Sequence, residues 1–411
     1  MSGEGDGATR WVAVWALFLS GCTLALHAGK VPSALLPLRE ELDLSLTAAG
    51  AIVATYAVLI ALGGIAAGLL VGVVGHVRFA VGGTALAGLG SLLGATADAL
   101  PRLLTGRVLE GAGWIIAVVA LPSLLARLAN TADRPLVMGL WGAFVPVGAG
   151  SMLLVAPAIQ GLAGWRLSWL VAGSVSLAAS VIVARVCRRE RDRLVPLAPP
   201  ASSVRESLRP VVRSPFADAL ADLGRPDAWL VGACFLLYSF QFTAVTSFLP
   251  TLLVETARFA LGPAAALTAF VILGNALGNV AAGYLPRRGV GHVPVLAFAA
   301  LASGAAAAVA YQAGWPVPLR IAAVFGFSVI AGLVPGTLFA TMPRVASSPA
   351  TLGVLIGLML QCAGVGQWLG PLALPAVVER LGSWSAAALP ISLAAVLGAV
   401  AAFGLRRLPA R

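Results

Sequence analysis

Long apolar stretches separated by short polar breaks run through almost the whole chain. Most of these stretches reach about 20 residues, the length that an α-helix needs to cross a bilayer. Breaks at glycine, proline and charge clusters divide them into twelve segments, so the pattern predicts an all-α integral membrane protein with twelve transmembrane helices. The expected spans lie at about residues 11–36, 47–70, 78–97, 102–127, 136–160, 166–186, 228–252, 261–284, 291–313, 318–342, 351–377 and 384–405.

One segment differs from all the others because it is both long and hydrophilic. Residues 187–227 interleave arginines with acidic residues and prolines, and a short amphipathic helix is expected within them near 216–223. The apolar stretches on either side are similar in length. The sequence therefore predicts an N-terminal six-helix bundle at 1–186, a linker at 187–227 and a C-terminal six-helix bundle at 228–411.

The two halves resemble each other at an offset of a little over two hundred residues. Pro37 at the end of the first span matches Pro250 at the end of the seventh. Two such repeats in parallel orientation favour alternating access, in which the halves rock around a site at their interface near the bilayer midplane. Three further positions match at one common spacing, namely Gly148, Pro157 and Gly164 with Gly366, Pro375 and Gly382.

Composition and charge fit a membrane protein rather than a soluble one. Hydrophobic residues make up 59% of the 411 residues and charged residues 10%, whereas soluble domains have roughly 25% charged residues. With the N-terminus inside, most arginines fall in loops on the side of the termini, which is the positive-inside pattern. Both termini and the linker are therefore expected in the cytoplasm, at the cell's inner (plasma) membrane. The net charge of +11 then reflects topology in the lipid bilayer, and no nucleic-acid partner is expected.

A lysine in the first span is the leading candidate for a functional residue. Ionisable side chains inside a span cost about 2.5–3.5 kcal/mol on insertion scales and by default mark a site inside the bundle. Lys30 is the single lysine of the chain and lies one helical turn from His27. The two residues are expected to bind an anionic substrate in the central cavity. The alternative is a lysine that extends to the outer headgroups beside a packing histidine.

Two charged residues of the fourth span share one helix face. Arg107 and Glu110 are three residues apart, a spacing that brings side chains together on a helix. Glu110 is the only carboxylate expected deep inside a span, which makes it the candidate proton carrier with Arg107 as its partner. A static ion pair is the alternative.

The second half offers neutral polar side chains where the first half has charged ones. They can line the cavity or form hydrogen bonds between helices, which contribute about 0.6 kcal/mol each. Gln241 is expected at the level of His27 and Lys30. The candidate substrate-binding residues here are Tyr238, Gln241, Asn275 and Gln361.

Nearly the whole chain resembles the major facilitator superfamily, and within it the cyanate permease and nitroimidazole transporter group. This resemblance implies the twelve-helix major facilitator fold, a monomer, a basic residue in this part of the first span and a role for Arg107 in proton transfer. The glycines and prolines of the fifth span, Pro146, Gly148 and Pro157, would allow close helix packing and bending. The motifs that carry the resemblance are residues 107–113 (RVLEGAG), 135–141 (PLVMGLW), 146–157, 164–166 (GWR) and 248–252 (FLPTL).

One loop departs from the family pattern. After the second span the superfamily usually has Gly-x-Leu-x-Asp-Arg-x-Gly, whereas this chain has GLLVGVVG from Gly68 to Gly75, without either charged residue. The copy after the eighth span keeps Arg287 and Gly289. The gate is therefore expected to depend on small-residue packing instead of ion pairs.

The preferred function is secondary active transport of a small organic or inorganic anion, coupled to protons. The alternative is a proton-antiport exporter of drugs or metabolites with a broad apolar cavity. An enzyme would need a catalytic constellation and a sensor an added domain, and neither is recognisable. No cofactor is expected, because coupling to protons needs only a gradient. No metal site is expected either, because the four cysteines are scattered and have no metal-binding spacing.

Overall fold

The computed structural model describes residues 8–44, 46–194, 215–347 and 351–407, and in these ranges it contains helices but no strands. The N-terminal half is built from long helices that run back and forth, because each apolar segment satisfies its own backbone hydrogen bonds. Its helices are α1 (Trp11–Gly29), α2 (Val31–Glu41), α3 (Leu46–Val74), α4 (His76–Ala95), α5 (Leu100–Leu128), α6 (Arg134–Gly142), α7 (Phe144–Arg189) and α8 (Arg191–Leu194).

The C-terminal half repeats this arrangement after the short helix α9 (Pro215–Leu223), which lies where the amphipathic helix of the linker is predicted. Its helices are α10 (Pro226–Ala257), α11 (Leu261–Tyr284), η2 (Leu285–Arg288), α12 (His292–Ala310), α13 (Val317–Ala331), α14 (Leu333–Val345), α15 (Leu352–Leu381), η3 (Trp384–Ala387), α16 (Ala388–Gly404) and η4 (Leu405–Arg407).

Twelve passes across the bundle result from these helices. Eleven helical segments of the described residues are long and apolar enough to cross a membrane. One of them, Arg134–Arg189, has 56 residues and is interrupted at Ala163 and Gly164, whose backbone angles are not helical. It therefore contains two spans, and the predicted twelve-helix fold is confirmed.

Matched turns in the two halves support the repeat that the sequence predicts. The turn between α3 and α4 contains Gly75 at φ 97°, and the turn after η2 contains Gly289 at φ 75°. The break within α7 contains Gly164 at φ 71°, and the end of α15 contains Gly382 at φ 65°. Positive φ favours glycine strongly, so both repeats require glycine at equivalent bends.

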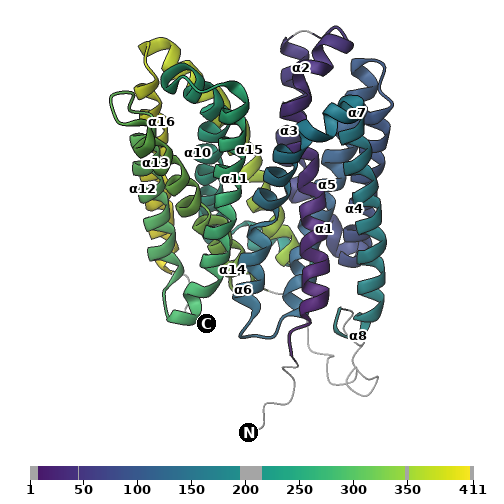
Figure 1. The fold of residues 1–411 in the computed structure, drawn as a ribbon. Helices are drawn as coiled ribbons and strands as arrows, with labels where there is room; N and C mark the ends of the chain where they lie inside the picture. The colour runs from purple at the N-terminus through teal and green to yellow at the C-terminus, as the bar shows by residue number, and fades with distance from the viewer. Residues whose placement is uncertain (1–7, 45, 195–214, 348–350, 408–411) are drawn as a thin grey trace, which may run out of the picture.

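The two halves lie side by side and meet at the end of the molecule where α1 begins and η4 ends (Figure 1). We call this the termini end. Along one seam, α3 and α15 approach so closely that a Cβ on Gly64 would lie 2.2 Å from the carbonyl oxygen of Gly357. A Cβ on Gly68 would likewise lie 2.7 Å from the carbonyl oxygen of Gly353. This side of the gate is closed by backbone packing between small residues.

The second seam joins α6 to α11 and α14, and here the expectation of a gate without ion pairs is wrong. A Cβ on Gly139 would lie 2.8 Å from the carbonyl oxygen of Asn279, so small residues again allow close approach. Arg287 of the C-terminal half also forms an ion pair with Asp133 of the N-terminal half. Thr9 donates a second hydrogen bond to this carboxylate. The loop after η2 thus keeps a charge contact that the loop after α3 lacks.

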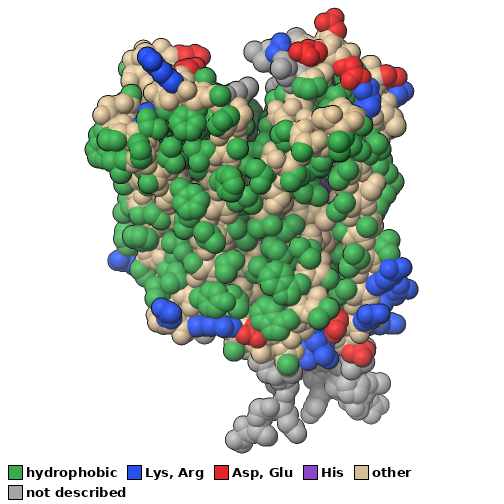
Figure 2. Space-filling model, viewed as in Figure 1, with side chains coloured by type: hydrophobic (Ala, Val, Ile, Leu, Met, Phe, Trp, Pro, Cys, Tyr) green, Lys and Arg blue, Asp and Glu red, His purple; other side chains and the backbone are tan. Residues whose placement is uncertain are grey.

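At the opposite end, which we call the open end, the halves separate. Figure 2 shows a notch there between two lobes, and charged side chains gather at the two ends of the molecule with an apolar band between them. This distribution matches a bundle that spans a membrane, because charged groups avoid the hydrocarbon region. The molecule is therefore closed at the termini end and open at the other.

Candidate functional site

A cavity between the two halves is the candidate substrate site. Its volume is about 840 Å³, including the solvent-filled space at its opening. Its walls come from α1, α3, α5, α6 and α7 of the N-terminal half and from α10, α11, α14 and α15 of the C-terminal half. The lining residues are Ala25, Ala28, Tyr56, Ile60, Trp114, Gly142, Phe144, Val145, Pro146, Phe235, Tyr238, Ser239, Phe242, Thr243, Asn275, Pro335, Phe339, Leu360, Ala363 and Gln367.

Aromatic rings dominate this central cavity. Tyr238 stacks between Phe235 and Phe242, with both pairs of ring centroids 5.7 Å apart. The Tyr238 hydroxyl donates to the side-chain oxygen of Asn275, 3.2 Å away. The described lining includes hydroxyl and amide groups but no Asp, Glu, Lys, Arg or His. A bound molecule would therefore contact rings and neutral hydrogen-bonding groups, the usual chemistry of a small-molecule site.

The charged residues lie in a separate cluster inside the N-terminal half. Lys30 is fully buried, and its Nζ lies 2.6 Å from Glu110 Oε1, 2.6 Å from Ser91 Oγ and 3.2 Å from His27 Nδ1. An ammonium group has three donors, so these three acceptors satisfy it completely. The same nitrogen lies 4.5 Å from the ring centroid of Trp169. Lys30 has no donor left for a ligand in this conformation.

Arg107 also belongs to this cluster and lies one helical turn before Glu110 on α5. Its guanidinium forms an ion pair with Glu110 and donates to the backbone oxygen of His27 at 2.9 Å. The predicted face shared by Arg107 and Glu110 is therefore present, but Glu110 binds two cations, not one. The carboxylate is fully buried, and burial of a charge is tolerated only with such partners.

One protonation pattern satisfies all of these contacts. With Lys30 as an ammonium, its Nζ donates to Nδ1 of His27, and the imidazole proton lies on Nε2, which is 2.9 Å from Ser176 Oγ. His27 is neutral in this pattern, two cations face one carboxylate, and the cluster carries a net charge of +1. We refer to His27, Lys30, Ser91, Arg107, Glu110 and Ser176 as the buried cluster.

Tyr56 lies between the buried cluster and the central cavity. Its ring covers the Arg107 guanidinium, with 4.6 Å from the central carbon to the ring centroid, and it also lines the cavity. Trp114 packs against Tyr56 with centroids 6.0 Å apart and lines the cavity as well. The excess charge is thus hidden from a ligand by one aromatic layer, although its electric field is not.

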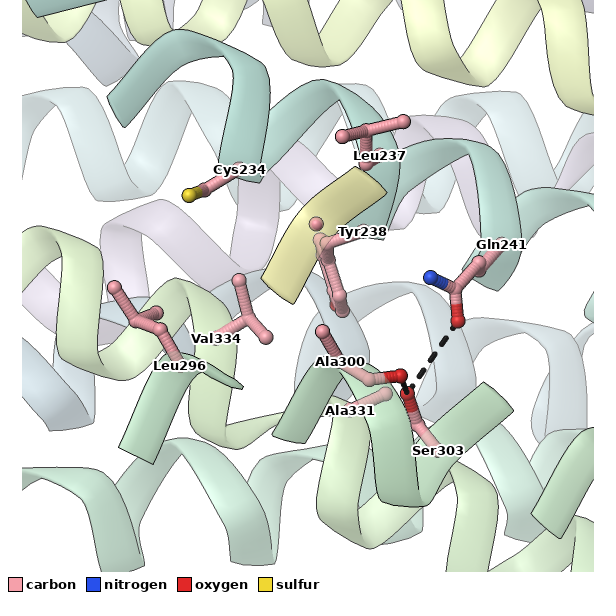
Figure 3. A pocket seen from close by; sticks show the side chains of 10 residues that line it. Cys234, Leu237, Tyr238, Gln241, Leu296, Ala300, Ser303, Ala331 and Val334 are labelled. Atoms are coloured by element: carbon pink, nitrogen blue, oxygen red, sulfur yellow. Dashed lines mark hydrogen bonds between the residues drawn. The ribbon is translucent and has the colours of Figure 1, made fainter. Parts of the chain in front are cut away.

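The C-terminal half has a neutral counterpart of the buried cluster. Figure 3 shows a smaller pocket between α10, α12, α14 and α16, where Gln241 and Ser303 face each other. Ser303 Oγ donates to Gln241 Oε1 at 3.4 Å. Gln241 and Ser303 lie on α10 and α12, the helices that correspond in the second repeat to α1 and α4, which carry Lys30 and Ser91. The pocket of the C-terminal half thus contains neutral polar groups where the N-terminal half has the buried cluster.

Sequence comparison identifies the family of this fold. The profile of the Major Facilitator Superfamily matches residues 13–371. The chain belongs to the major facilitator superfamily. A comparison with curated proteins gives no significant match.

Solved structures of major facilitator superfamily transporters have the same fold. FucP in its outward conformation superimposes with a TM-score of 0.72 at 18% identity, over 95% of this chain and 98% of that chain. A variant of FucP, the fucose:proton symporter of E. coli, gives 0.70 at 18% identity over the same shares. The human organic anion transporter MFSD10 (TETRAN) gives 0.71 at 15% identity, over 96% and 99%. At these identities the likeness establishes the fold alone.

The structure separates the predicted substrate-binding residues into two groups. Tyr238 and Asn275 line the central cavity. Lys30 and His27 are expected there as well but are not among its lining residues, and their polar atoms contact Glu110, Ser91 and Ser176. Gln241 lies in the pocket of the C-terminal half.

Gln361 joins the two halves, since its Oε1 accepts a hydrogen bond from the backbone N–H of Ile65 at 3.1 Å. Gln361 is not among the residues that line the central cavity, whereas Gln367, six residues further along α15, is.

The predicted packing residues lie at several kinds of contact. Gly68 is at the closed seam, Gly75 forms the turn after α3, and Pro146 lines the cavity. A Cβ on Gly148 would lie 2.2 Å from the carbonyl oxygen of Cys22, so Gly148 packs α7 against α1 within one half. Pro157 lies inside α7.

Two tryptophans near span ends, Trp165 and Trp169, are buried. Trp169 covers Lys30, and Trp165 packs edge-on against it with centroids 5.2 Å apart. Trp165 also donates to Glu41 at 2.8 Å. The hydrogen bond from Arg166 holds the pKa of Glu41 below its ordinary value of 4.5, against the opposing effect of burial and with a further contribution from the hydrogen bond of Trp165. Sequence reasoning missed Ser91, Ser176 and Tyr56 because single hydroxyls in a span carry no positional signal.

Proposed function

We propose that this protein is a proton-coupled secondary transporter of a small organic anion with an apolar or aromatic body. The observation that supports this most is the charge count behind the cavity wall, where two cations share one carboxylate. An organic anion would place its body among the rings of the cavity and its charge towards Tyr56. Tyr238 and Asn275 would form hydrogen bonds with it.

Lys30 and Arg107 would act on the anion through their field and not by contact. One unit charge at about 10 Å, with an effective dielectric constant of about 20, contributes about 1.7 kcal/mol. This energy corresponds to roughly a 17-fold gain in affinity. If the cluster releases one proton it becomes neutral, and this gain is lost.

Proton and anion would therefore favour each other's binding. The coupling is reciprocal, because the factor by which the proton strengthens anion binding equals the factor by which the anion strengthens proton binding. Such mutual support is the requirement for symport. Glu110, with Lys30 and His27 around it, is the centre of the proton-binding cluster, and Arg107 holds its second oxygen. The names of two structural neighbours, a fucose:proton symporter and an organic anion transporter, agree with both parts of the proposal.

The orientation of the protein in the membrane is inferred from the arginine distribution, and its monomeric state from the family. The termini end, with its excess of arginine, would face the cytoplasm across the inner (plasma) membrane. The described conformation then opens to the outside, and rocking of the halves would expose the cavity to the cytoplasm. The transporter would act as a monomer with protons and a small-molecule substrate.

The test compares the wild type with Lys30→Gln, which keeps a donor for Glu110 but removes the charge. Purified full-length protein is titrated with aromatic carboxylates and their neutral amides at several pH values, by thermal stabilisation and by uptake into proteoliposomes. The wild type should prefer the carboxylate more strongly at lower pH. Lys30→Gln should lose about 17-fold in carboxylate affinity together with this pH dependence, while Gln241→Leu, the control in the other half, should keep both.

An exporter of lipophilic compounds is the second candidate, since the described cavity lining has many rings and no charged side chain. It would bind lipophilic amides and cations as tightly as carboxylates, and Lys30→Gln would leave ligand preference unchanged. That outcome would refute the anion proposal.

A further inference from the structure

A second cavity lies between the halves at the termini end, well away from the central cavity. It encloses about 820 Å³ including its mouth. One wall comes from α5 and the start of α6, and the other from the end of α14 and the start of α15; Figure 1 shows α6 and α14 side by side at this end. The lining residues are Ser123, Ala126, Arg127, Arg134, Pro343, Ala346, Ser347 and Leu352. We call it the gate cavity.

Two arginines of the gate cavity have no acidic partner among the described residues. Arg127 and Arg134 are both half-buried. Each has one hydrogen bond to a backbone oxygen, from Arg127 Nη1 to Leu194 at 2.5 Å and from Arg134 Nε to Ala126 at 3.2 Å. Most donors of both guanidinium groups remain free. Two unpaired, partly desolvated cations at one cavity are favourable only if an anion or water compensates them.

A buried hydroxyl points to the same conclusion. Ser123 is 2% exposed and its Oγ has no hydrogen-bond partner within the described structure. An unsatisfied buried hydroxyl costs about 1–3 kcal/mol, so its place in the cavity wall fits a ligand that supplies the missing bond. Ser347, at the rim, already donates to Asp222 and is not free to do so.

Helix dipoles do not account for the positive character of this cavity. α6 and α15 begin at its rim, while α5 and α14 end there, and these opposite contributions offset one another. The charge comes from the arginines. Guanidinium groups match the geometry of phosphate oxygens, which they bind by two parallel hydrogen bonds.

We propose that the gate cavity binds a phosphate group, carried by a soluble phosphate or by a phospholipid headgroup, and that this ligand holds the transporter closed at the termini end. The arginines belong to the N-terminal half, and the opposite wall belongs to the C-terminal half. Opening of the termini end leaves both arginines on the N-terminal half but takes away the opposite wall and exposes them to water, which weakens their attraction for phosphate. A ligand shifts an equilibrium only by the difference in its affinity for the two conformations, so phosphate at 100 times its dissociation constant favours the closed gate by at most about 100-fold. The proposal does not depend on the substrate of the central cavity.

The experiment uses full-length protein in nanodiscs of phosphatidylcholine, titrated with inorganic phosphate against chloride at constant ionic strength. Melting temperature and the distance between spin labels across the termini end are recorded. Phosphate should raise the melting temperature and increase the closed population. The double variant Arg127→Gln and Arg134→Gln should need at least 10-fold more phosphate, and Ser123→Ala should show a smaller loss.

Arg344→Gln is the matched control, because Arg344 is an exposed arginine of the same end that lines a different pocket. It should respond like the wild type. A second arm replaces inorganic phosphate by phosphatidylglycerol in the nanodisc. A response to soluble phosphate, or one to phosphatidylglycerol alone, supports the site and identifies the source. No response in either arm, or equal responses in all variants, overturns the proposal. If the double variant does not fold, Ser123→Ala is the test, and a response equal to that of the wild type overturns the proposal.

Discussion

The closed seam between α3 and α15 can be forced open by one methyl group. In Gly357→Ala the new Cβ would lie 2.2 Å from the carbonyl oxygen of Gly64, whereas ordinary contact begins at 3.4 Å. The two backbones must therefore separate by about 1.2 Å, and overpacking of this kind costs typically 1–3 kcal/mol. Because the halves are separate bodies, opening of the gate relieves the clash without unfolding either half.

The expected result is a change of conformational population. A penalty of 1–3 kcal/mol on the closed state alone reduces its share relative to other states by roughly 5- to 150-fold. The measurement is the distance distribution between spin labels on Arg78 and Arg344, which are exposed residues of opposite halves at the termini end. Longer distances should appear in Gly357→Ala, and thermal unfolding should remain cooperative.

Gly72→Ala is the control, on α3, the helix that packs against α15 at this seam. A Cβ on Gly72 meets nothing within 4 Å, so this substitution adds only the higher helix propensity of alanine, about 1 kcal/mol. Its distance distribution should match the wild type. An unchanged distribution in Gly357→Ala, or an equal change in Gly72→Ala, would refute the idea that glycine packing holds this seam closed.

Three smaller perturbations test other contacts. Arg287→Gln removes the partly exposed ion pair across the second seam and should weaken the closed gate by about 1 kcal/mol at most, an effect that vanishes in high salt and is seen with the same labels. Asn275→Leu removes a hydrogen-bonding group from the central cavity, and substrate affinity in a binding assay should fall about 10-fold; the melting temperature should fall as well, because Ser328, Asn279 and Tyr238 lose their buried hydrogen-bond partner. Burial raises the pKa of Asp222, but hydrogen bonds from Thr351 and Ser347 and the charge of Arg225 lower it more, so that it lies below the ordinary 3.8. The ionised carboxylate therefore stabilises the folded protein above pH 3.8, and this stabilisation is lost as the pH falls through the lower folded-state pKa. Asp222→Asn should have a lower melting temperature than the wild type at pH 7. The difference should disappear in melting curves at the most acidic pH values.

The helices and their number could be predicted because a bilayer imposes a strong local rule. A span must satisfy its own backbone and present about 20 apolar residues, and both conditions are visible in a short window of sequence. The repeat was visible for a similar reason. Gly164 and Gly382 recur because the same bend needs positive φ in each half, and such a requirement leaves the same residue at the same spacing.

The residues of the candidate site were recognisable by type but not by position. Lys30, Arg107 and Glu110 stand out since ionisable groups are rare in a span. Their mutual arrangement depends on Ser91 and Trp169, from helices 61 and 139 residues further along the chain than Lys30, and no local pattern encodes such a distance. The sequence thus predicted that Lys30 binds an anionic substrate, whereas in the fold Lys30 binds the carboxylate of Glu110.

The sequence by itself determined that this chain spans a membrane twelve times as two related halves, with ionisable side chains deep in the spans of the N-terminal half and neutral polar ones deep in the spans of the C-terminal half. The tertiary structure decided which surfaces of the helices face the cavity, which charges neutralise one another and where the gate closes. The physical reason is that hydropathy is a property of single segments, whereas desolvation and pairing of a charge depend on every side chain that surrounds it.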